Sequence, residues 1–168
     1  TSITDKSCYG VGGIVAIAYQ TATIVSCCSW TDTVSGTTAK GGIVGYIGTG
    51  YYAPTKIQDC YYKKSDAFYG FGYVQSGGTG SYSDKVTNKD ASNNEYTYTA
   101  TAVENLSDLN NTDVPLMNTA HDTTYDYMFE AGAAAGTDLP TVIAGAYKLT
   151  VTFASTGDIS LSSDSFST

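Results

Sequence analysis

The sequence contains no arginine and only one histidine among its 168 residues. Eight basic residues stand against sixteen acidic ones, which gives a net charge of −8. A nucleic-acid-binding surface neutralises phosphates with lysine and arginine, so this balance excludes nucleic acid as a partner. The same charge argues against an anionic membrane surface, and no apolar run is long enough to span a bilayer. We therefore expect neither nucleic-acid binding nor membrane insertion.

Catalytic and metal-binding motifs are also missing. A serine-hydrolase triad would depend on His121, whose neighbour Asp122 is too close along the chain to orient it. A zinc-peptidase motif needs two histidines. The Asp and Asn residues at 108–113 are rich in calcium-type ligands, but the EF-hand spacing fails, and helix capping and turns explain them. We expect no catalytic residue, no metal and no cofactor.

What the sequence does have is glycine, tyrosine and a repeat, with 18 Gly and 15 Tyr. The segment Gly-Gly-Ile-Val at 12–15 recurs at 41–44, 29 residues later. The pattern Ile-x-x-Cys at 24–27 recurs at 57–60, 33 residues later. An insertion around residues 50–54 explains the difference between the two periods. A repeat of this length predicts units that stack on one another to bury a shared core.

The repeated segments read as short strands. Ile24 and Ile57 are the predicted core positions. Since Ile and Cys are three positions apart, both can point inward only if the strand bends between them. Residues 75–94 are polar and read as a loop, with a short strand near Tyr82 as the alternative. The expected strands are 11–19, 23–30, 41–47, 56–63, a degenerate third copy at 67–74, and 95–103.

The second half of the chain is expected to form a cap on the stack of repeats. One or two short helices are expected between 104 and 120, with Asp113 as N-cap and Pro115 in the first turn. Further strands are expected at 127–129, 139–142 and 146–154. The domain organisation that follows is repeat rungs at 1–80, a segment at 81–143 that closes the open end of the stack, and a terminal strand or linker at 144–168 that leads to a next domain or a partner.

The four cysteines lie at repeat-like positions in the first 60 residues: Cys8, Cys27, Cys28 and Cys60. They fit small buried side chains that stack rung on rung. A disulfide is the open alternative, with three full pairings possible. No Cys-x-x-Cys is present, which argues against zinc.

Aromatic residues form the candidate binding surface. Exposed Tyr and Trp rings offer flat faces on which sugar rings or a partner protein can stack. The alternative is that the same rings fill the corners of the stack and its cap. The candidate residues are Trp30, Tyr51, Tyr52, Tyr61, Tyr62, Tyr69 and Tyr73, with Phe71 beside them.

Gly-Gly-Ile-Val-Gly-Tyr at 41–46, followed after a loop by Ile-x-Asp-Cys-Tyr at 57–61, resembles the GLUG-motif repeats of large bacterial surface proteins. These include adhesins, IgA-specific metallopeptidases and many proteins of gut Bacteroidetes. The resemblance covers residues 1–75 and departs at Ala16, where glycine is expected, and at Phe71. It implies an all-β, right-handed parallel β-helix or β-solenoid at the bacterial cell surface, and it brings no catalytic residues.

The favoured function is a non-catalytic, surface-exposed adhesion or stalk module of a larger protein, which binds glycan or a host surface protein. One alternative is a subunit of an extracellular filament, in which the ends of the solenoid or the terminal strand at 146–154 pair with further copies or domains of the same protein. A second alternative is a glycan-active β-helix enzyme that uses Asp59 and Asp66 as paired carboxylates.

Overall fold

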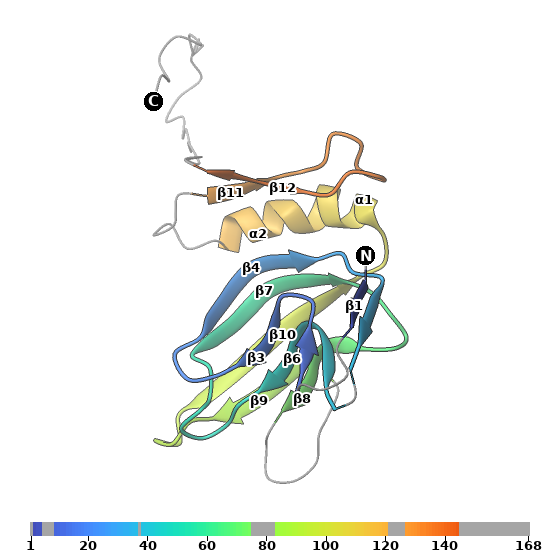
Figure 1. The fold of residues 1–168 in the computed structure, drawn as a ribbon. Coiled ribbons are helices and arrows are strands. Elements are labelled where there is room, and N and C mark those ends of the chain that lie inside the picture. The colour runs from blue at the N-terminus through green and yellow to red at the C-terminus, as the bar shows by residue number, and fades with distance from the viewer. Residues whose placement is uncertain (1, 5–8, 37, 75–82, 121–126, 145–168) are drawn as a thin grey trace, which may run out of the picture.

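The structure is a computed structural model that describes residues 2–4, 9–36, 38–74, 83–120 and 127–144. This part of the chain consists mostly of strands with a single helical segment, which confirms the mostly-β class expected from the sequence (Figure 1). No helix in these ranges is long and apolar enough to cross a membrane.

One sheet stacks three strands in parallel and contains both copies of Ile-x-x-Cys. The register places Ile24 opposite Ile57 and Cys27 opposite Cys60, so the two copies lie side by side in the pairing that the repeat predicts. The third strand pairs with the second through Ala100, opposite Cys60. The strands are β4 (Thr23–Ser29), β7 (Lys56–Lys63) and β10 (Glu95–Val103).

The second parallel sheet is built from the Gly-Gly segments. Gly12 lies opposite Gly41, and Val44 lies opposite Phe71 in the degenerate third copy. Glycine is needed at Gly42 because a Cβ there would overlap the ring of Tyr62. The first copy is split into two strands. The strands are β2 (Val11–Gly12), β3 (Val15–Ala18), β6 (Lys40–Ile47) and β8 (Tyr69–Val74).

Each Ile-x-x-Cys strand bends at the residue before its cysteine. Ser26 has a φ of 49° and Asp59 a φ of 52°, both in the left-handed region. This conformation costs a non-glycine residue roughly 1–2 kcal/mol. The bend shifts the alternation of side chains by one position, so that Ile57 and Cys60 are both buried. The bend that the odd spacing requires for both side chains to point inward is therefore present.

The main core lies between the two parallel sheets. Ile57 and Cys60 contribute from one sheet, and Ile43, Val44 and Phe71 from the other. Fully burying each aliphatic side chain contributes about 1.5–3 kcal/mol. Because the core is shared by successive copies, no copy buries its apolar face alone.

Two further pairings complete the body. β1 (Ser2–Thr4) pairs in parallel with β5 (Thr33–Ser35). β9 (Lys85–Lys89) pairs antiparallel with β10, at the outer edge of the first sheet. The expectation of a loop over 75–94, with a short strand near Tyr82 as the alternative, is therefore wrong at β9, whose Val86 and Asn88 face inward. Tyr82 itself lies outside the described residues. The boundary expected at residue 80 is also too early, because β10 continues the parallel stack.

The helical segment runs from α1 (Leu106–Asp108) through a π-helical turn, η1 (Leu109–Asp113), into α2 (Val114–Ala120). Its N-cap is Asn105, whose side chain accepts a hydrogen bond from the backbone of Asp108 at 2.9 Å. The prediction that Asp113 caps a helix is wrong. Pro115 lacks the backbone N–H that a regular helical turn would use. The wider π-helical turn η1 comes directly before it, and the helix continues through Pro115 into α2.

The helix covers a face of the stack and not its open end. Leu109 and Met117 pack against Tyr61 of β7, with Cys28 of β4 beside them. Above the helix lies a hairpin of β11 (Tyr127–Glu130) and β12 (Thr141–Ala144) (Figure 1). The helix and the hairpin thus do not close the end of the stack as expected, but β9, which belongs to the same 81–143 segment, covers that edge. The strand expected at 146–154 lies outside the described residues.

Ile43→Asp should prevent folding, because an unpaired carboxylate would enter the dry core. Ile14→Asp is the matched control, since it occupies the same repeat position but is 40% exposed, whereas Ile43 is 0% exposed. Circular dichroism and urea unfolding should show loss of cooperative unfolding in the first variant and little change in the second. A folded Ile43→Asp protein would contradict the inward-facing register.

Candidate functional site

Three loops meet at one corner of the stack. They join β3 to β4 (residues 19–22), β6 to β7 (48–55) and β9 to β10 (90–94). The backbone N–H of Gln20 donates to the carbonyl of Tyr52 at 2.8 Å, and that of Gly50 donates to the carbonyl of Lys89 at 2.9 Å. These bonds hold the loops beside one another, so side chains from three separate segments share one surface.

The middle loop carries the insertion that breaks the repeat. It turns sharply through two backbone bonds, from Tyr52 to Thr49 and from Ala53 to Gly50, each 3.1 Å long. Gly50 adopts a φ of 59°, which glycine tolerates without strain. The turn places Tyr51 at the surface, where it is 71% exposed, with Tyr52 beside it at 51%. The insertion thus adds two exposed rings to an otherwise regular corner.

Buried hydrogen bonds fix the inserted loop from below. The Tyr98 hydroxyl donates to the carbonyl of Pro54 at 2.6 Å. The Asn88 side-chain amide donates to the carbonyl of Gly48 at 2.8 Å. Tyr98 and Asn88 are both buried and come from β10 and β9. The two strands that follow the repeats therefore position the loop that the second repeat inserts.

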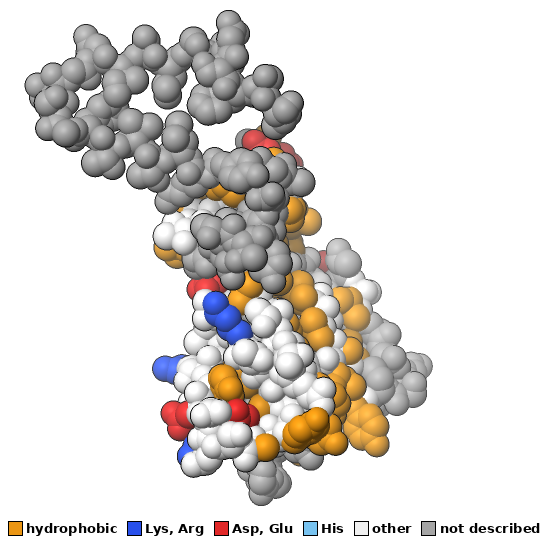
Figure 2. Space-filling model, turned by 90° about the vertical axis from the view of Figure 1, so that its left-hand side faces the viewer, with side chains coloured by type: hydrophobic (Ala, Val, Ile, Leu, Met, Phe, Trp, Pro, Cys, Tyr) orange, Lys and Arg blue, Asp and Glu red, His pale blue; other side chains and the backbone are white. Residues whose placement is uncertain are grey.

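A shallow, open pocket of about 320 Å³ lies at this corner. Its walls combine two tyrosine rings with hydroxyl, amide and carboxylate groups. Figure 2 looks towards this side of the molecule and shows hydrophobic side chains gathered on its lower part. The residues that line the pocket are Gln20, Thr21, Gly50, Tyr51, Ala53, Thr55, Asp90, Ala91, Ser92 and Tyr96.

Asp90 organises the third loop. One of its carboxylate oxygens accepts bonds from the backbone of Ser92 at 2.9 Å and of Asn94 at 2.8 Å. The other accepts from the Asn94 amide at 2.8 Å and the Tyr96 hydroxyl at 3.1 Å. These bonds, the one from the Asn94 side chain foremost, lower the pKa of Asp90. The carboxylate is therefore charged at neutral pH and holds the Tyr96 ring at the pocket wall.

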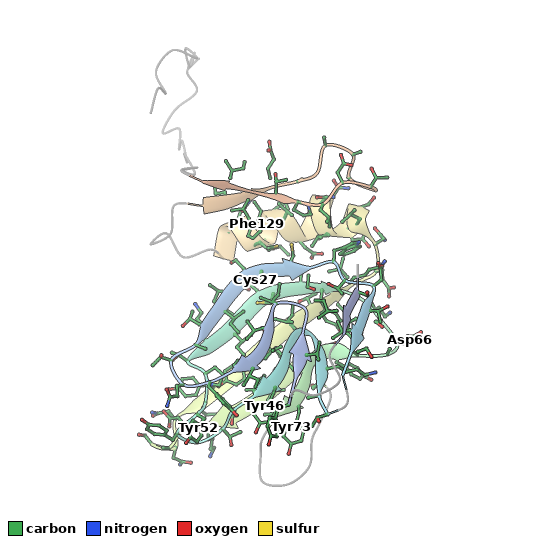
Figure 3. The ribbon with its side chains drawn as sticks, viewed as in Figure 1. Cys27, Tyr46, Tyr52, Asp66, Tyr73 and Phe129 are labelled. Atoms are coloured by element: carbon green, nitrogen blue, oxygen red, sulfur yellow. The ribbon has the colours of Figure 1, made fainter. Side chains whose placement is uncertain are left out.

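Five tyrosines continue from the pocket across the second sheet, and we call them the tyrosine row: Tyr51, Tyr52, Tyr19, Tyr46 and Tyr73. Their successive ring centroids are 5.4, 5.5, 5.8 and 5.2 Å apart. The last pair is stacked with an angle of 16° between the ring planes. Figure 3 shows Tyr46 beside Tyr73, with Tyr52 nearer the corner. The other pairs are edge-to-face, at 86° and 89°, or tilted, at 44°. These contacts hold the rings in place and leave ring faces pointing in several directions.

The centre of the row is partly shielded from water. Burial raises the pKa of Tyr46 to about 12, with a smaller contribution from the neighbouring Tyr19. Its hydroxyl therefore stays protonated at neutral pH and remains a hydrogen-bond donor.

The candidate aromatic residues divide between the surface and the interior. Tyr51, Tyr52 and Tyr73 belong to the tyrosine row. The prediction that Tyr61 and Tyr62 lie on the surface is wrong, because they are 6% and 2% exposed. Tyr61 packs under the helix, and the Tyr62 hydroxyl donates to the half-buried Asp84 at 2.8 Å. Neither ring can offer a face to a ligand.

The two remaining candidates lie away from the pocket. Trp30 is half-buried and packs against the cluster beneath the helix, with the Lys63 ammonium 5.8 Å from its ring centroid. Phe71 is wholly buried in the core. Tyr69 is exposed but stands at the opposite end of β8 from Tyr73. These residues do not contribute to the corner site.

Sequence reasoning did not identify Tyr19, Tyr46, Tyr96 or Asp90. A signal for Tyr46 was present, because Gly-Tyr ends both Gly45-Tyr46 and Gly72-Tyr73, and the structure pairs the two tyrosines in register. No comparable signal marks Asp90, whose loop reaches the corner only through the pairing of β9 with β10.

The acidic and cysteine candidates are placed elsewhere. Asp59 lies on β7 and accepts a bond from the Gln58 amide at 2.8 Å. Asp66 lies on the side of the molecule opposite Tyr52 (Figure 3). Cys27, Cys28 and Cys60 are free thiols, while Cys8 and His121 lie outside the described residues. Among the residues that the structure describes, no cluster of three His, Cys, Asp or Glu could hold a metal ion.

Comparison with known proteins identifies no family. No protein-family model, curated protein or solved structure matches this chain. The assignment of a function therefore depends on the geometry and chemistry of the corner.

Tyr98→Phe should destabilise the protein by about 1–3 kcal/mol, because the Pro54 carbonyl would lose its buried partner. Tyr96→Phe is the control: it removes a hydroxyl from the same strand, but from a half-buried ring whose partner Asp90 keeps its other bonds. Urea unfolding should therefore show a smaller loss for Tyr96→Phe. An equal loss in both variants would mean that the bond to Pro54 does not fix the loop.

Tyr46 should make the protein sensitive to alkali. Its pKa is raised from 10.0 to about 12, so the folded state holds this proton more tightly than the unfolded state. The resulting stability is fully present below pH 10 and is lost as the pH rises through 12. Urea unfolding at pH 9 to 12 should therefore show a shallower decline for Tyr46→Phe than for the unchanged protein. Parallel curves would contradict the shift.

Proposed function

We propose that this chain is a non-catalytic binding module that recognises a neutral glycan at the corner pocket. The observation that carries the proposal is the continuity between the pocket and the tyrosine row. Tyr51 lines the pocket and is also the first ring of the row. A ligand bound in the pocket would thus have further aromatic faces beside it.

The chemistry of the pocket suits a sugar. The apolar face of a sugar ring can stack on Tyr51 or Tyr96, as amphipathic ligands do on exposed aromatic rings. Its hydroxyls can exchange hydrogen bonds with the side chains of Gln20, Thr21 and Ser92, which line the same pocket. In a concave site, a small number of polar groups placed among aromatic faces fixes the orientation of a small ligand.

Charge favours a neutral sugar over an acidic one. Asp90 is ionised at neutral pH, and no lysine is among the described residues that line the pocket. The net charge of the chain is −8. A carboxylate or sulfate on a sugar would be repelled and would find no cation to pair with.

Size favours the end of a glycan. A volume of about 320 Å³ lies near the lower limit for ligand pockets, whose volumes run from about 300 to 1,000 Å³. An extended polysaccharide would therefore enter the pocket with one terminus and continue along the tyrosine row.

We further propose that the parallel stack is a short right-handed β-helix of the GLUG-repeat kind. Support comes from the pairing of successive copies at the repeat period, Gly12 with Gly41 and Ile24 with Ile57. On this reading the chain is an adhesion or stalk module of a larger bacterial surface protein. Its polar, weakly charged composition suits an extracellular location.

Binding without turnover is favoured over glycan hydrolysis. A glycosidase uses two carboxylates about 5–9 Å apart. Asp90 is the one acidic residue among those described at the pocket, and its oxygens already hold the loop. Asp66 lies on the opposite side from Tyr52 (Figure 3).

Asp59 is not among the described residues that line the pocket. Asp59→Asn should therefore change no glycan turnover in an activity assay.

The test is a glycan array that includes mucin, read with Tyr51→Ala. Loss of a stacking face should weaken binding of neutral glycans about tenfold, since about 1.4 kcal/mol corresponds to that factor. Tyr69→Ala is the matched control, because it removes an exposed ring away from the pocket. It should leave binding unchanged.

Three outcomes would overturn the proposal. Equal losses in both variants would place the site elsewhere, and a preference for sialylated or sulfated glycans would contradict the charge argument. No binding by a folded sample would leave a spacer or a filament subunit as the better interpretation. Size-exclusion chromatography with and without residues 144–168 would then test assembly.

A further inference from the structure

Cys27 and Cys60 are register partners on neighbouring parallel strands. Strands in a sheet lie about 4.8 Å apart. Disulfides join residues whose Cα atoms are about 4.4–6.8 Å apart. The backbone of β4 and β7 thus already holds the two cysteines within the range that a disulfide needs.

Both side chains face the same core. Cys60 is 1% exposed and belongs to the main core, and Cys27 is half-buried and packs against that core. Figure 3 marks Cys27 on β4. Cys28 packs instead with the cluster beneath the helix, on the other side of the sheet. The bends at Ser26 and Asp59 produce this arrangement, because they turn the next side chain of each strand inward.

The two thiols differ in their readiness to react. The Cys60 thiol lowers the pKa of Cys27 by hydrogen bonding to it. The same interaction and burial raise the pKa of Cys60. The Cys60 Sγ also donates to the carbonyl of Gln58 at 3.1 Å. Cys27, the more exposed of the two, is therefore the thiolate that meets an oxidant first.

We propose that Cys27 and Cys60 form an oxidisable pair that closes into a disulfide between successive rungs. The oxidant is a small disulfide such as oxidised glutathione. The Cys27 thiolate attacks one sulfur of it and releases one glutathione thiolate, which takes up a proton. The Cys60 sulfur then attacks the Cys27 sulfur, and its proton leaves with the second glutathione. Two electrons pass from the pair to the oxidant.

The bond would tie the first rung to the second across 33 positions. A link of this span restricts the unfolded chain, and we expect the melting temperature to rise by about 10 °C. The link lies in the core and does not involve the pocket, so this inference does not depend on the proposed function.

The experiment treats the full chain with oxidised glutathione and maps its peptides by mass spectrometry. The expected result is a loss of about 2 Da, for two hydrogens, and a peptide that joins Cys27 to Cys60. The melting temperature should rise and return after reduction with dithiothreitol. A Cys8→Ser variant should behave in the same way, as should Cys28→Ser, the matched control from the adjacent position.

Cys27→Ser should abolish both the link and the thermal shift. A peptide that joins either residue to Cys28 or Cys8 would overturn the proposal. So would glutathione adducts that never resolve, or the absence of oxidation. These readouts come from the unchanged chain, so they hold even where a cysteine variant folds poorly.

Discussion

The in-register pairing of β4 with β7 is the constraint on which the rest of the structure depends. It places Ile24 on Ile57 and Cys27 on Cys60, and it fixes which face of each strand enters the core. A slip by one residue would turn the whole apolar set to the opposite face. The register also requires the same bend in both strands, at Ser26 and Asp59, so that neighbouring backbones follow one path.

The corner site follows from a departure from that regularity. A repeat that stacked without interruption would offer only short turns at its corners. The extra residues of the second copy extend past the turn and expose Tyr51, while Tyr98 and Asn88 hold the base of the loop from the following strands. The repeated residues build the core, and the inserted ones add Tyr51 and Tyr52 to a surface that two neighbouring loops complete. This division is common in proteins whose rigid framework carries binding loops.

The two sides of the first sheet perform different tasks. Its inner side completes the main core, and its outer side receives the helix through Tyr61, Leu109 and Met117. The adjacent cysteines Cys27 and Cys28 mark the two sides, since one packs inward and the other under the helix. Tyr61 and Tyr62 are divided by the same sheet, while the tyrosine row lies on the second sheet and its loops. The tyrosines under the helix or in the core stabilise the fold, and those of the tyrosine row remain available to a ligand.

The sequence by itself determined the repeat, its period and the strands that carry it, and it showed that Ile and Cys could both face the core only across a bend. These features are local, or recur at a fixed spacing, so alternation and period are enough to find them. It did not determine that Tyr61 and Tyr62 are buried, because their exposure depends on a helix and a strand distant in the chain. Nor did it reveal that Asp90 and Tyr96 meet Gln20 and Tyr51 at one corner. That meeting arises from the pairing of β9 with β10 and of β10 with β7, and only the tertiary structure decides which separate loops share a surface.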